Sequence, residues 1–376
     1  MKDWSNVEFS KVCKKTGLNY QPDKTGKLPY IGLEHIESGS AILKTWGIEN
    51  EVKSSKTKFK KGQILYGKLR PYLDKSIIAP FDGVCSTDIL VFDSTDLALN
   101  EYLVYLIHSY GFINYAKSTT SGVQHPRTSW NVIKKFNFNL PPLHEQRNIA
   151  YVLSTVQKAM EQQDKLIRTT TELKKALMQK LFTEGTNGEK QKQTEIGLVP
   201  ESWKVIDFPK FVLLQRGKDL IKKDFIEGSI PVAGSNGIIG YHNASFVKAP
   251  GVTVGRSGSC GKVWFYETDF WAHNTSLYVK NFNGNNAKFS YYYLQYLDIG
   301  RFKTGASVPT LDRNSLNTFK ISVPPNAEQS EIANSIHAVE CKINIHQKKK
   351  QILMDMFKTL LHELMTGQRR VNHIEF

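Results

Sequence analysis

The chain contains the same 44-residue pattern twice, 183 positions apart and without a gap. The first copy occupies residues 140–183 and the second occupies residues 323–366, and 12 of the 44 positions are identical. The same spacing relates four further pairs upstream of the repeat: Gly122 and Gly305, Pro126 and Pro309, Asn131 and Asn314, and Phe136 and Phe319. A gap-free repeat of this extent implies two structurally equivalent halves in one polypeptide, which is a covalent pseudo-dimer. Two similar working surfaces related by an approximate two-fold axis are therefore expected.

Each copy of the repeat predicts one long helix. Starting at Glu145 and at Glu328, apolar residues return at alternate steps of four and three, which is the heptad pattern of a coiled-coil seam. No Pro or Gly interrupts either pattern, and these residues stand only at its ends: Pro142 and Gly185 in the first copy, Pro325 and Gly367 in the second. A helix over residues 145–183 would be roughly 60 Å long at about 1.5 Å per residue. No compact domain needs a helix of that length.

Polar residues occupy seam positions near the middle of both helices, namely Gln163 and Thr170 in one and His346 and Lys350 in the other. In an antiparallel pair these positions face one another, and polar residues at a seam commonly fix register and orientation. The plainer interpretation is a locally hydrated stretch of the coiled coil. Lys174, a further seam position, is expected to be a solvated edge residue.

The segment before each helix predicts a mixed α+β unit. Short runs rich in branched and aromatic residues alternate with Gly, Asp and Asn turns, which is typical of strands. These runs are residues 63–66, 75–79 and 88–92 in the first segment and 252–254, 263–266 and 276–279 in the second. Aromatic amphipathic stretches at 101–116 and 289–302 predict helices. The second segment opens at residues 196–203, where Trp203 has Trp4 as its candidate counterpart.

The chain is therefore expected to divide into four parts. They are a first globular domain (1–140), a central repeated helix (141–184), a second globular domain with an N-terminal linker (185–322), and a distal repeated helix with its tail (323–376). The polar run 184–194 forms the connection into the second domain. The predicted fold is α+β, with two mixed α/β domains separated by two long helices that form a coiled coil with pseudo-two-fold symmetry.

The charge of the chain indicates an anionic partner. The formal net charge is +15 and the isoelectric point is near 9.4. Residues 1–140 carry 19 Lys/Arg against 13 Asp/Glu and residues 185–322 carry 17 against 11, so each has a net charge of +6. The repeats are nearly neutral. A basic balance by itself fits nucleic acid, an acidic membrane or an acidic protein.

Cysteine usage and hydropathy indicate the cellular compartment. The four cysteines, Cys13, Cys85, Cys260 and Cys341, are far apart and form no C-x-x-C pair, so neither disulfides nor a zinc site are expected. No N-terminal run combines basic residues with an apolar stretch, and no window approaches 18 uninterrupted apolar residues. We expect a soluble protein of the cytoplasm.

These motifs together resemble the specificity subunit of Type I restriction-modification enzymes. The signature Pro-Pro-x-x-Glu-Gln-x-x-Ile-Ala stands at residues 141–150 and again at 324–333. A Gly-Leu-Val-Pro-Glu-Ser-Trp domain opening follows at 197–203, and a Leu-x-x-Gly ending stands at 364–367. The resemblance covers essentially the whole chain, and the duplicated signature in this order is specific. Two departures are a first domain that starts almost at residue 1, and Asn326-Ala327 in place of Leu143-His144.

The resemblance implies two target recognition domains, each reading one half of a split DNA sequence, with the helices as an antiparallel spacer. At about 3.4 Å per base pair, a rod of roughly 60 Å holds the domains no more than about 18 base pairs apart. Overlap of the domains with the rod shortens this to something like one helical turn. The implied partners are double-stranded DNA with a bipartite target, two modification (methyltransferase) subunits and two ATP-driven restriction (translocase/nuclease) subunits. S-adenosylmethionine, ATP and magnesium would belong to these partners, so no cofactor, metal or catalytic residue is assigned to this chain.

Candidate DNA contacts lie in basic segments of both domains. Residues 53–75 hold eight Lys/Arg, the single acid Asp74 and two tyrosines, a composition suited to phosphate binding with aromatic contacts. The alternative is a solvated surface, as is usual for a run of lysines. The candidates are Lys53, Lys56, Lys58, Lys60, Lys61, Lys68, Arg70 and Tyr72 in the first domain, and Arg216, Lys218, Lys222, Lys223, Arg256 and Lys262 in the second.

Two loops at equivalent positions of the repeat, residues 122–127 and 305–310, differ in their polar residues. Arginine and amide side chains match the paired donors and acceptors of guanine and adenine edges, and two readers of different half-sites should differ in this way. The loops add Gln124, His125 and Arg127 from the first domain and Ser307 from the second. A turn ordered only by Gly and Pro is the alternative. In the helices, the signature pairs Glu145-Gln146 and Glu328-Gln329 are candidates for subunit docking or domain packing.

Each enzymatic motif that the sequence suggests lacks a feature that its chemistry requires. The glycine cluster at 255–262 hints at a phosphate-binding loop, but Val263 replaces the required Ser/Thr and Arg256 stands in place of the first glycine. Pro22-Asp23 with Glu51-Val-Lys53 resembles a nuclease metal site only superficially, because Glu51 lies in a polar run without an apolar strand.

The sequence 139–142 differs from the Asn/Asp-Pro-Pro-aromatic motif of amino-methyltransferases by an extra Leu, and no glycine-rich cofactor site accompanies it. The chain is therefore predicted to be a non-catalytic DNA recognition scaffold. The runner-up is a stand-alone sequence-specific DNA-binding regulator of the same architecture, and an autonomous nuclease is disfavoured by the failed motifs.

Overall fold

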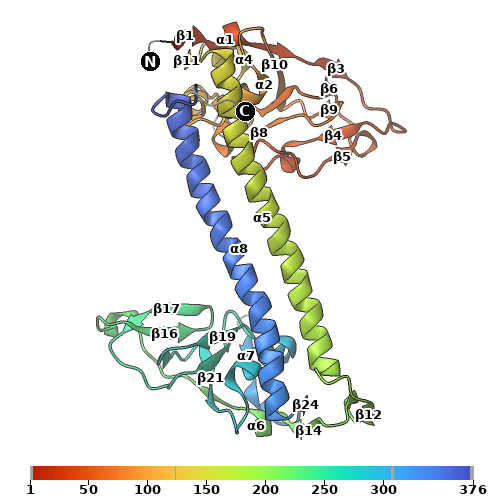
Figure 1. The fold of residues 1–376 in the computed structure, drawn as a ribbon, viewed down its shortest axis with the longest axis vertical. Helices are drawn as coiled ribbons and strands as arrows, with labels where there is room; N and C mark the ends of the chain where they lie inside the picture. Colours follow the sequence, from red (N-terminus) through yellow and green to blue (C-terminus); the bar gives the residue numbers. More distant parts are fainter. Residues whose placement is uncertain (1–2, 123, 306–308, 373–376) are drawn as a thin grey trace. The chain divides into compact units, whose positions relative to one another are not determined.

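The computed structural model describes residues 3–122, 124–305 and 309–372 (Figure 1). The chain forms two compact units, one of Met1–Asp164 with Gln347–Phe376 and the other of Lys165–His346. Each unit combines a sheet-rich domain with part of both long helices. The four-part boundaries drawn from the sequence remain a prediction.

The repeat forms two long helices, as its pattern predicts. Helix α5 spans Leu143–Glu184 and helix α8 spans Asn326–Thr366, and both are drawn as continuous helices in Figure 1. Each ends at a glycine with positive φ, Gly185 at 72° and Gly367 at 71°, a conformation that residues with a Cβ rarely adopt. The glycines therefore stop the helices by backbone geometry rather than by a change of polarity.

Within each unit the two helices run antiparallel. In the first unit, the beginning of α5 and the end of α8 share one hydrophobic core, to which they contribute Leu153 and Val156, and Phe357 and Leu364. In the second unit, the end of α5 and the beginning of α8 share another core, to which they contribute Leu181 and Phe182, and Ile332 and Ile336. The heptad seam predicted from the sequence is the side of each helix that these cores cover.

Both units contain a four-stranded antiparallel sheet with the same strand order. In the first unit the order is β2 (Cys13–Thr16), β10 (Ile89–Ser94), β7 (Ile64–Gly67) and β8 (Ser76–Ile78). In the second unit it is β15 (Leu213–Arg216), β21 (Ser276–Asn281), β18 (Gly251–Gly255) and β19 (Val263–Tyr266). All six strands predicted from the sequence lie in these two sheets.

The start of each domain pairs with the strand that leads into a long helix. Strand β1 (Ser5–Glu8) pairs with β11 (Asn137–Leu140), and β14 (Lys204–Asp207) pairs with β24 (Lys320–Val323), in the same antiparallel register. Short helices follow the opening strands, α1 (Phe9–Val12) in the first unit and α6 (Phe208–Phe211) in the second. The two domains are thus built on one plan.

Additional strands distinguish the units. The first unit adds a five-stranded sheet of β3 (Leu18–Tyr20), β6 (Lys56–Phe59), β9 (Gly83–Cys85), β4 (Pro29–Ile31) and β5 (Gly47–Ile48). The second unit adds a three-stranded sheet of β17 (Gly237–His242), β16 (Ile230–Gly234) and β20 (Trp271–Ala272), and the pair β22 (Lys303–Thr304) and β23 (Thr310–Leu311). These insertions come between the shared elements.

Two local predictions need correction. The stretch 101–116 is two helices, α2 (Asn100–Ile107) and α3 (Tyr110–Ser118), because the Ser109 side chain accepts the Phe112 N–H and starts a new helix; α4 (Trp130–Ile133) follows. In the second unit α7 (Ala287–Tyr296) ends before Asp298, whose φ is 44°, and a 3-10 turn follows. The connection at 184–194 ends in strand β12 (Gln191–Thr194), which pairs with β13 (Gly197–Pro200).

The prediction that Lys174 is a solvated edge residue is wrong. Its ammonium lies 2.6 Å from Glu340 Oε1 and 5.3 Å from the centre of the Tyr292 ring, and its side chain is 16% exposed. The Tyr292 hydroxyl donates to Glu340 Oε2 at 2.6 Å. Burial, followed by the hydrogen bond to Glu340, raises the pKa of Tyr292. Helix α7 packs over this part of the seam, which the seam pattern alone does not reveal.

The first unit has a neutral group at the equivalent place. Tyr105 donates to Gln157 Oε1 at 3.1 Å and packs edge-on against Phe357 with ring centres 6.2 Å apart. The 183-residue spacing relates Gln157 to Glu340 and Lys174 to Phe357. Pairing α5 with α5 of another copy would set Lys174 against Gln157, and pairing α8 with α8 would set Glu340 against Phe357. Either arrangement leaves a charge unpaired, so the seam favours α5 with α8.

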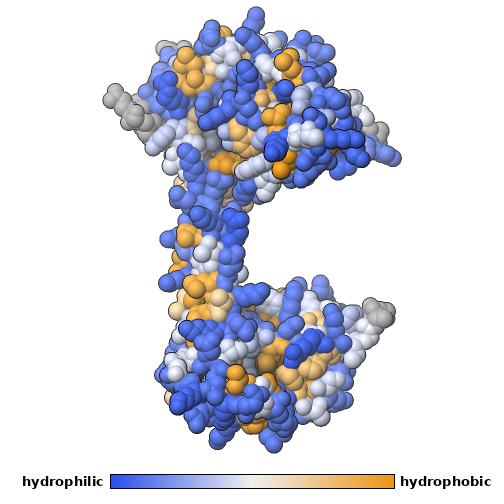
Figure 2. Space-filling model, turned by 90° about the vertical axis from the view of Figure 1, so that its right-hand side faces the viewer, coloured by the Kyte–Doolittle hydropathy of each residue, from blue (hydrophilic) through white to orange (hydrophobic). Residues whose placement is uncertain are grey.

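The face of the molecule drawn in Figure 2 is largely hydrophilic, with exposed apolar residues along the helices. In the second unit, Leu166, Leu173 and Ile345 are 43%, 55% and 49% exposed. Among the residues described, no helix combines the length and the hydropathy that a membrane span requires.

We predict that Lys174→Phe destabilises the second unit, because Glu340 keeps its charge but loses its cation. The pair is partly exposed, so we expect a loss of about 1–3 kcal/mol in the free energy of unfolding, below the range for fully buried pairs. Adding Glu340→Gln recreates the group found in the first unit and should recover most of the loss. Urea denaturation of both variants measures this, and a double variant no more stable than Lys174→Phe would contradict it.

Candidate nucleic-acid interface

The glutamate of each repeat signature is buried at the first turn of its helix. Glu145 is 0% exposed and accepts the indole N–H of Trp4 at 2.9 Å. Glu328 is 3% exposed and accepts the indole N–H of Trp203, also at 2.9 Å. The two tryptophans therefore occupy corresponding places, and each ties the opening of its domain to the start of a long helix.

The neighbouring glutamines bind the domain in the same manner. Gln146 accepts the Leu99 N–H at 3.0 Å and donates to the Leu97 and Pro141 carbonyls at 3.0 and 2.9 Å. The counterpart Gln329 accepts the Asn286 N–H at 2.9 Å and donates to Asn285 Oδ1 and the Pro324 carbonyl at 2.8 and 3.0 Å. All four signature side chains are buried and bonded inside their own unit. The sequence predicted either subunit docking or domain packing for these side chains, and the contacts described here belong to domain packing.

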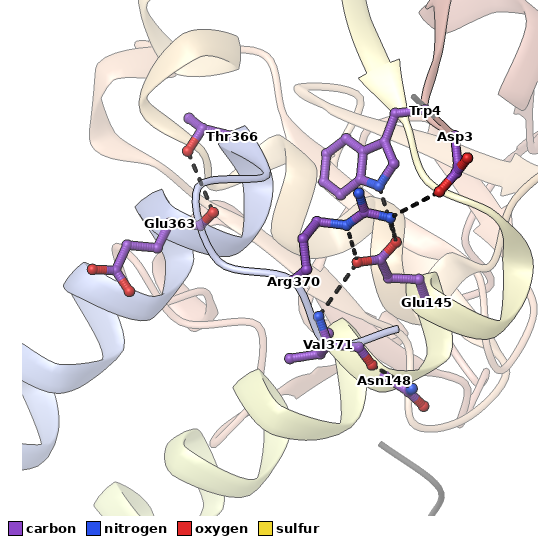
Figure 3. A network of polar contacts seen from close by, with 8 residues as sticks. All are labelled: Asp3, Trp4, Glu145, Asn148, Glu363, Thr366, Arg370 and Val371. Atoms are coloured by element: carbon purple, nitrogen blue, oxygen red, sulfur yellow. Dashed lines mark hydrogen bonds and ion pairs between the residues drawn. The ribbon is translucent and has the colours of Figure 1, made fainter. Parts of the chain in front are cut away.

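Glu145 also binds the segment that follows the other long helix (Figure 3). Arg370 donates to its two carboxylate oxygens at 2.7 and 2.8 Å, and Asn148 holds the Val371 carbonyl at 2.7 Å. Burial alone would raise the pKa of Glu145, but the hydrogen bonds from Arg370 and Trp4 outweigh it and lower that pKa. Sequence reasoning missed Arg370; the only signal was the pair of arginines after Gly367.

In the second unit, the corresponding glutamate accepts a hydrogen bond from a neutral backbone N–H where the first unit has an arginine. Glu328 Oε1 accepts the backbone N–H of Thr186 at 2.7 Å, and Thr186 lies two residues beyond the end of α5. In both units one carboxylate thus joins three segments: the domain opening, the start of one helix, and the chain after the other helix. These shared hydrogen bonds hold each domain, with its loops, in a fixed position on the helices of its unit.

Two loops of the first domain that were predicted separately form one surface. The Arg70 N–H donates to the Pro126 carbonyl at 2.7 Å, and the Thr128 N–H donates to the Lys68 carbonyl at 3.0 Å. Leu69 and Arg127 form a β-bridge. We call this set the first loop surface, and its candidate DNA-contacting residues are Lys68, Arg70, Gln124, His125 and Arg127. All but Lys68, which is half-buried, are exposed.

The turn after Arg70 is strained and anchored. Arg70 and Asp74 both have φ of 51°, which is uncommon for residues other than glycine, and the exposed Tyr72 lies between them. The buried His108 contacts Asp74 Oδ1 through Nδ1 at 2.6 Å and the Ser76 carbonyl through Nε2 at 3.0 Å. Backbone strain that surrounding contacts maintain is typical of functional sites.

The remaining candidate lysines of the first domain belong to β6 (Lys56–Phe59) and the turns at its ends. Lys53, Lys58, Lys60 and Lys61 are exposed, and the Lys58 ammonium lies 4.1 Å from the centre of the Tyr20 ring. Lys56 differs, because it is 4% exposed and its ammonium donates to the Ser54 carbonyl and hydroxyl at 2.7 and 2.6 Å. Burial lowers the pKa of Lys56. The strand turns this side chain inward, which argues against its contacting a phosphate.

The candidates of the second domain lie around β15 and β18. Arg216, Lys218, Lys222, Lys223 and Lys262 are exposed, and Arg256 is half-buried. The Lys218 ammonium lies 4.5 Å from the centre of the Phe246 ring, and that of Lys262 donates to Asn236 Oδ1 at 3.2 Å. Ser307 lies outside the described residues.

Matching main-chain bonds show which positions of the two domains correspond. The Lys68 N–H donates to the Asp88 carbonyl and the Arg256 N–H donates to that of Thr275, each at 2.9 Å. The Lys68 carbonyl receives the Thr128 N–H, and the Arg256 carbonyl receives the Leu311 N–H at 2.8 Å. The corresponding pairs are therefore Lys68 and Arg256, Asp88 and Thr275, Arg127 and Thr310, and Thr128 and Leu311.

The side chains at these corresponding positions differ in charge. In the first domain, Arg127 donates to both oxygens of Asp88 at 2.9 and 3.2 Å, and this bonding is the main cause of the lowered pKa of Asp88. In the second domain, Thr275 and Thr310 are neutral, and the arginine is Arg256 instead. One backbone scaffold thus presents different donors and acceptors, as readers of different base edges require.

The segments considered for catalysis have other structural roles. Glu51 lies in a 3-10 turn, where its Oε2 accepts the Ile48 N–H at 3.3 Å, and not on a strand. The cluster at 255–262 forms the turn between β18 and β19. Over the ranges that the structure describes, no group of three or more His, Cys, Asp or Glu side chains is placed to hold a metal ion.

The sequence matches a known family over most of its length. The model of the family described as the Type I restriction modification DNA specificity domain matches residues 1–169 and again 200–354. The Type I restriction enzyme MjaVIII specificity subunit of Methanocaldococcus jannaschii is 24% identical, with 100% of this chain and 95% of that protein covered. The EcoDI specificity subunit of Escherichia coli is 31% identical over 149 residues, which are 39% of this chain and 33% of that protein.

Solved structures share the fold. The S subunit of a Type I restriction-modification system from M. genitalium superimposes with a TM-score of 0.67 at 17% identity, covering 96% of each chain. A chain from a structure describing complex assembly and conformational transition of the type I R-M system gives a TM-score of 0.56 at 17% identity, covering 98% of this chain and 99% of that one. At this identity the likeness concerns the fold alone.

We predict that Arg370→Met destabilises the first unit by about 2–4 kcal/mol at pH 7, because Glu145 remains buried without its cation. The pKa of Glu145 is lowered in the folded chain, so the stabilisation is complete above the unfolded-state value of about 4.3 and is lost as the pH falls through the lower folded-state value. The difference between variant and wild type should therefore shrink in acid.

The neighbouring Arg369→Met provides the control. Arg369 pairs with Glu363 at the surface, where ion pairs contribute little, so its loss should change stability by less than about 1 kcal/mol. Urea denaturation at neutral and acidic pH measures both variants. Equal losses for the two substitutions would contradict the assignment of Arg370.

Proposed function

The chain belongs to the family of the Type I restriction modification DNA specificity domain, and from this membership we propose that it is the specificity subunit of a Type I restriction-modification complex. Each unit reads one half of a bipartite double-stranded DNA target. The two long helices set the gap between the halves. The subunit works in the cytoplasm and supplies recognition, whereas methyl transfer and ATP-driven cleavage belong to its partners.

One observation carries this proposal: two domains share a backbone scaffold but differ in the side chains at corresponding loop positions. Lys68 and Arg127 of the first domain correspond to Arg256 and Thr310 of the second. The framework that supports the loops keeps the same residues, as with Glu145 and Glu328. A protein that read a symmetric target would need identical loops, so the difference favours a target with two unlike halves.

The helices offer contacts for the methyltransferase subunits. Leu166, Leu173 and Ile345 are exposed apolar side chains on α5 and α8 in the second unit. Exposed apolar side chains on a helix are suited to packing against helices of a partner. Two equivalent units favour two methyltransferase subunits and, for cleavage, two restriction subunits.

Co-expression with a cognate methyltransferase subunit tests the proposal. The two chains should co-purify, and sequencing of methylated adenines in the host genome should give one bipartite motif with a fixed gap. A chain that binds its DNA site tightly as a lone monomer, with no methyltransferase partner, would instead fit a regulator.

We predict that Arg127→Thr alters only one half of the methylated motif. The substitution installs the residue that the second domain carries at the corresponding position, and loss of a good arginine–base contact costs roughly 1–3 kcal/mol of discrimination. Motif mapping should show relaxed or changed bases in the half read by the first unit. Thr310→Ala is the matched variant for the other half, and an effect of Arg127→Thr on both halves would contradict the assignment.

We predict that lengthening both helices changes the gap but neither half-site. Four inserted residues extend a helix by about 6 Å, equivalent to roughly two base pairs at most. Selection of bound DNA from a library with randomised spacer lengths measures the preferred gap. The same insertion in α5 alone disturbs the seam and serves as the control for simple loss of folding. An unchanged gap in the doubly lengthened protein would refute the spacer role.

A further inference from the structure

A polar cavity of about 380 Å³ lies in the first unit, beside the first loop surface. Its wall combines cationic, hydroxyl, amide and a few apolar side chains: Lys15, Lys68, Leu90, Ser121, Arg127, Thr128, Ser129, Trp130 and Asn131. Three of these residues are cationic and none is acidic. A concave wall with this balance of charge is suited to an anion.

The main chain fixes two of the cations at the cavity. Arg127 is held by paired backbone bonds with Ser121, each of 3.0 Å, and by its bridge to Leu69. Asp88 binds the Nε and Nη2 atoms of Arg127, so the remaining N–H donors of the guanidinium stay available for the proposed base contact, while its positive charge adds to the cavity wall. The Lys68 ammonium lies 3.9 Å from the same carboxylate. A single acid behind the wall therefore orients both cations.

Two further features of the wall support a bound ligand. Lys15 is exposed on β2, opposite Phe92 of β10, and adds the third cation. Thr128 is 3% exposed, and its hydroxyl has no hydrogen-bond partner among the residues described. Buried polar groups are almost always satisfied, so a hydroxyl of this kind marks a wall that a ligand or a water completes.

The second unit provides a natural contrast. Leu214, opposite Val279, takes the place of Lys15, and Leu311 takes the place of Thr128. Asp312 replaces Ser129, and its carboxylate accepts the Asn314 N–H and the Ser315 hydroxyl, each at 2.9 Å. Two apolar residues and an acid therefore stand where the first unit has a cation and two hydroxyls. Of the three cations only Lys68 has a cationic counterpart, Arg256, so the described residues of the second unit offer an anion no comparable place.

We propose that the cavity of the first unit binds a backbone phosphate of the DNA duplex beside the half-site that this unit reads, and that the second unit has no counterpart. This inference rests on the proposed function. A duplex is favoured over a small free anion because the adjoining loops carry the exposed Arg70, Gln124 and His125. A long polyanion can contact these side chains and the cavity together.

The test compares Lys15→Ala with Lys14→Ala in the full-length chain, purified together with its methyltransferase subunit. Both lysines are exposed on β2, but only Lys15 lines the cavity. Binding of a fluorescently labelled random-sequence duplex is measured by anisotropy over a range of salt concentrations. Lys15→Ala should weaken binding and reduce the slope of log K against log salt by about 0.9, the value for one phosphate contact. Lys14→Ala should leave the slope unchanged.

A second variant introduces, at residue 129, the aspartate that the second unit carries at the corresponding position. Ser129→Asp places a carboxylate at the cavity and should weaken duplex binding at least as much as Lys15→Ala, because like charges repel. Thermal melts of each variant verify folding. Because Ser129 is exposed and precedes the first turn of α4, the new aspartate can act as an N-cap, so no loss of stability is expected.

Each possible result distinguishes one explanation of the binding data from the others. Equal effects of Lys14→Ala and Lys15→Ala would show only a diffuse positive field and would overturn the cavity assignment, as would an unaltered Lys15→Ala variant. Saturable binding of inorganic phosphate that depends on Lys15, with duplex binding unaffected by Lys15→Ala, would assign the cavity to a free anion and overturn the DNA source. If the wild-type chain, purified together with its methyltransferase subunit, binds no duplex, the proposed function is overturned together with the cavity.

Discussion

The buried carboxylate at the first turn of each long helix is the interaction on which the rest of the structure depends. Glu145 and Glu328 accept an indole N–H from Trp4 and Trp203, and each also binds the segment that leaves the other helix. A domain is thereby fixed to a helix pair at the point where its chain enters and leaves. Because the acceptor is charged and buried, every donor around it must stay in place.

This rigid base explains how one scaffold can present two different recognition surfaces. The strand order of the four-stranded sheets and the main-chain bonds at Lys68 and Arg256 are the same in both domains, while the side chains at corresponding positions differ. Asp88 holds Arg127 in the first domain, whereas Thr275 and Thr310 stand in the second. Changes of specificity can therefore occur in the loops without disturbing the helices, since the two sets of residues have separate partners.

The helix seam shows that the two halves are similar but not interchangeable. Tyr292, Glu340 and Lys174 form a charged group where the first unit has a neutral one. Each charge is compensated when α5 packs against α8, and not when either helix packs against its own counterpart from another copy. The symmetry of the repeat creates competing pairings, and these few polar residues select among them at some cost in stability.

The sequence by itself determined the two helices, their apolar seams and six strands of the two related sheets, because these features depend on short-range periodicity and on a repeat of fixed spacing. Only the tertiary structure decided the partner of Arg370, the burial of Lys56 and the ion pair of Lys174. The tertiary structure also decided that Lys15 and Arg127, which are 112 positions apart, line one cavity. Such contacts join distant segments through sheet order and helix packing, and neither periodicity nor composition encodes which side chains meet there.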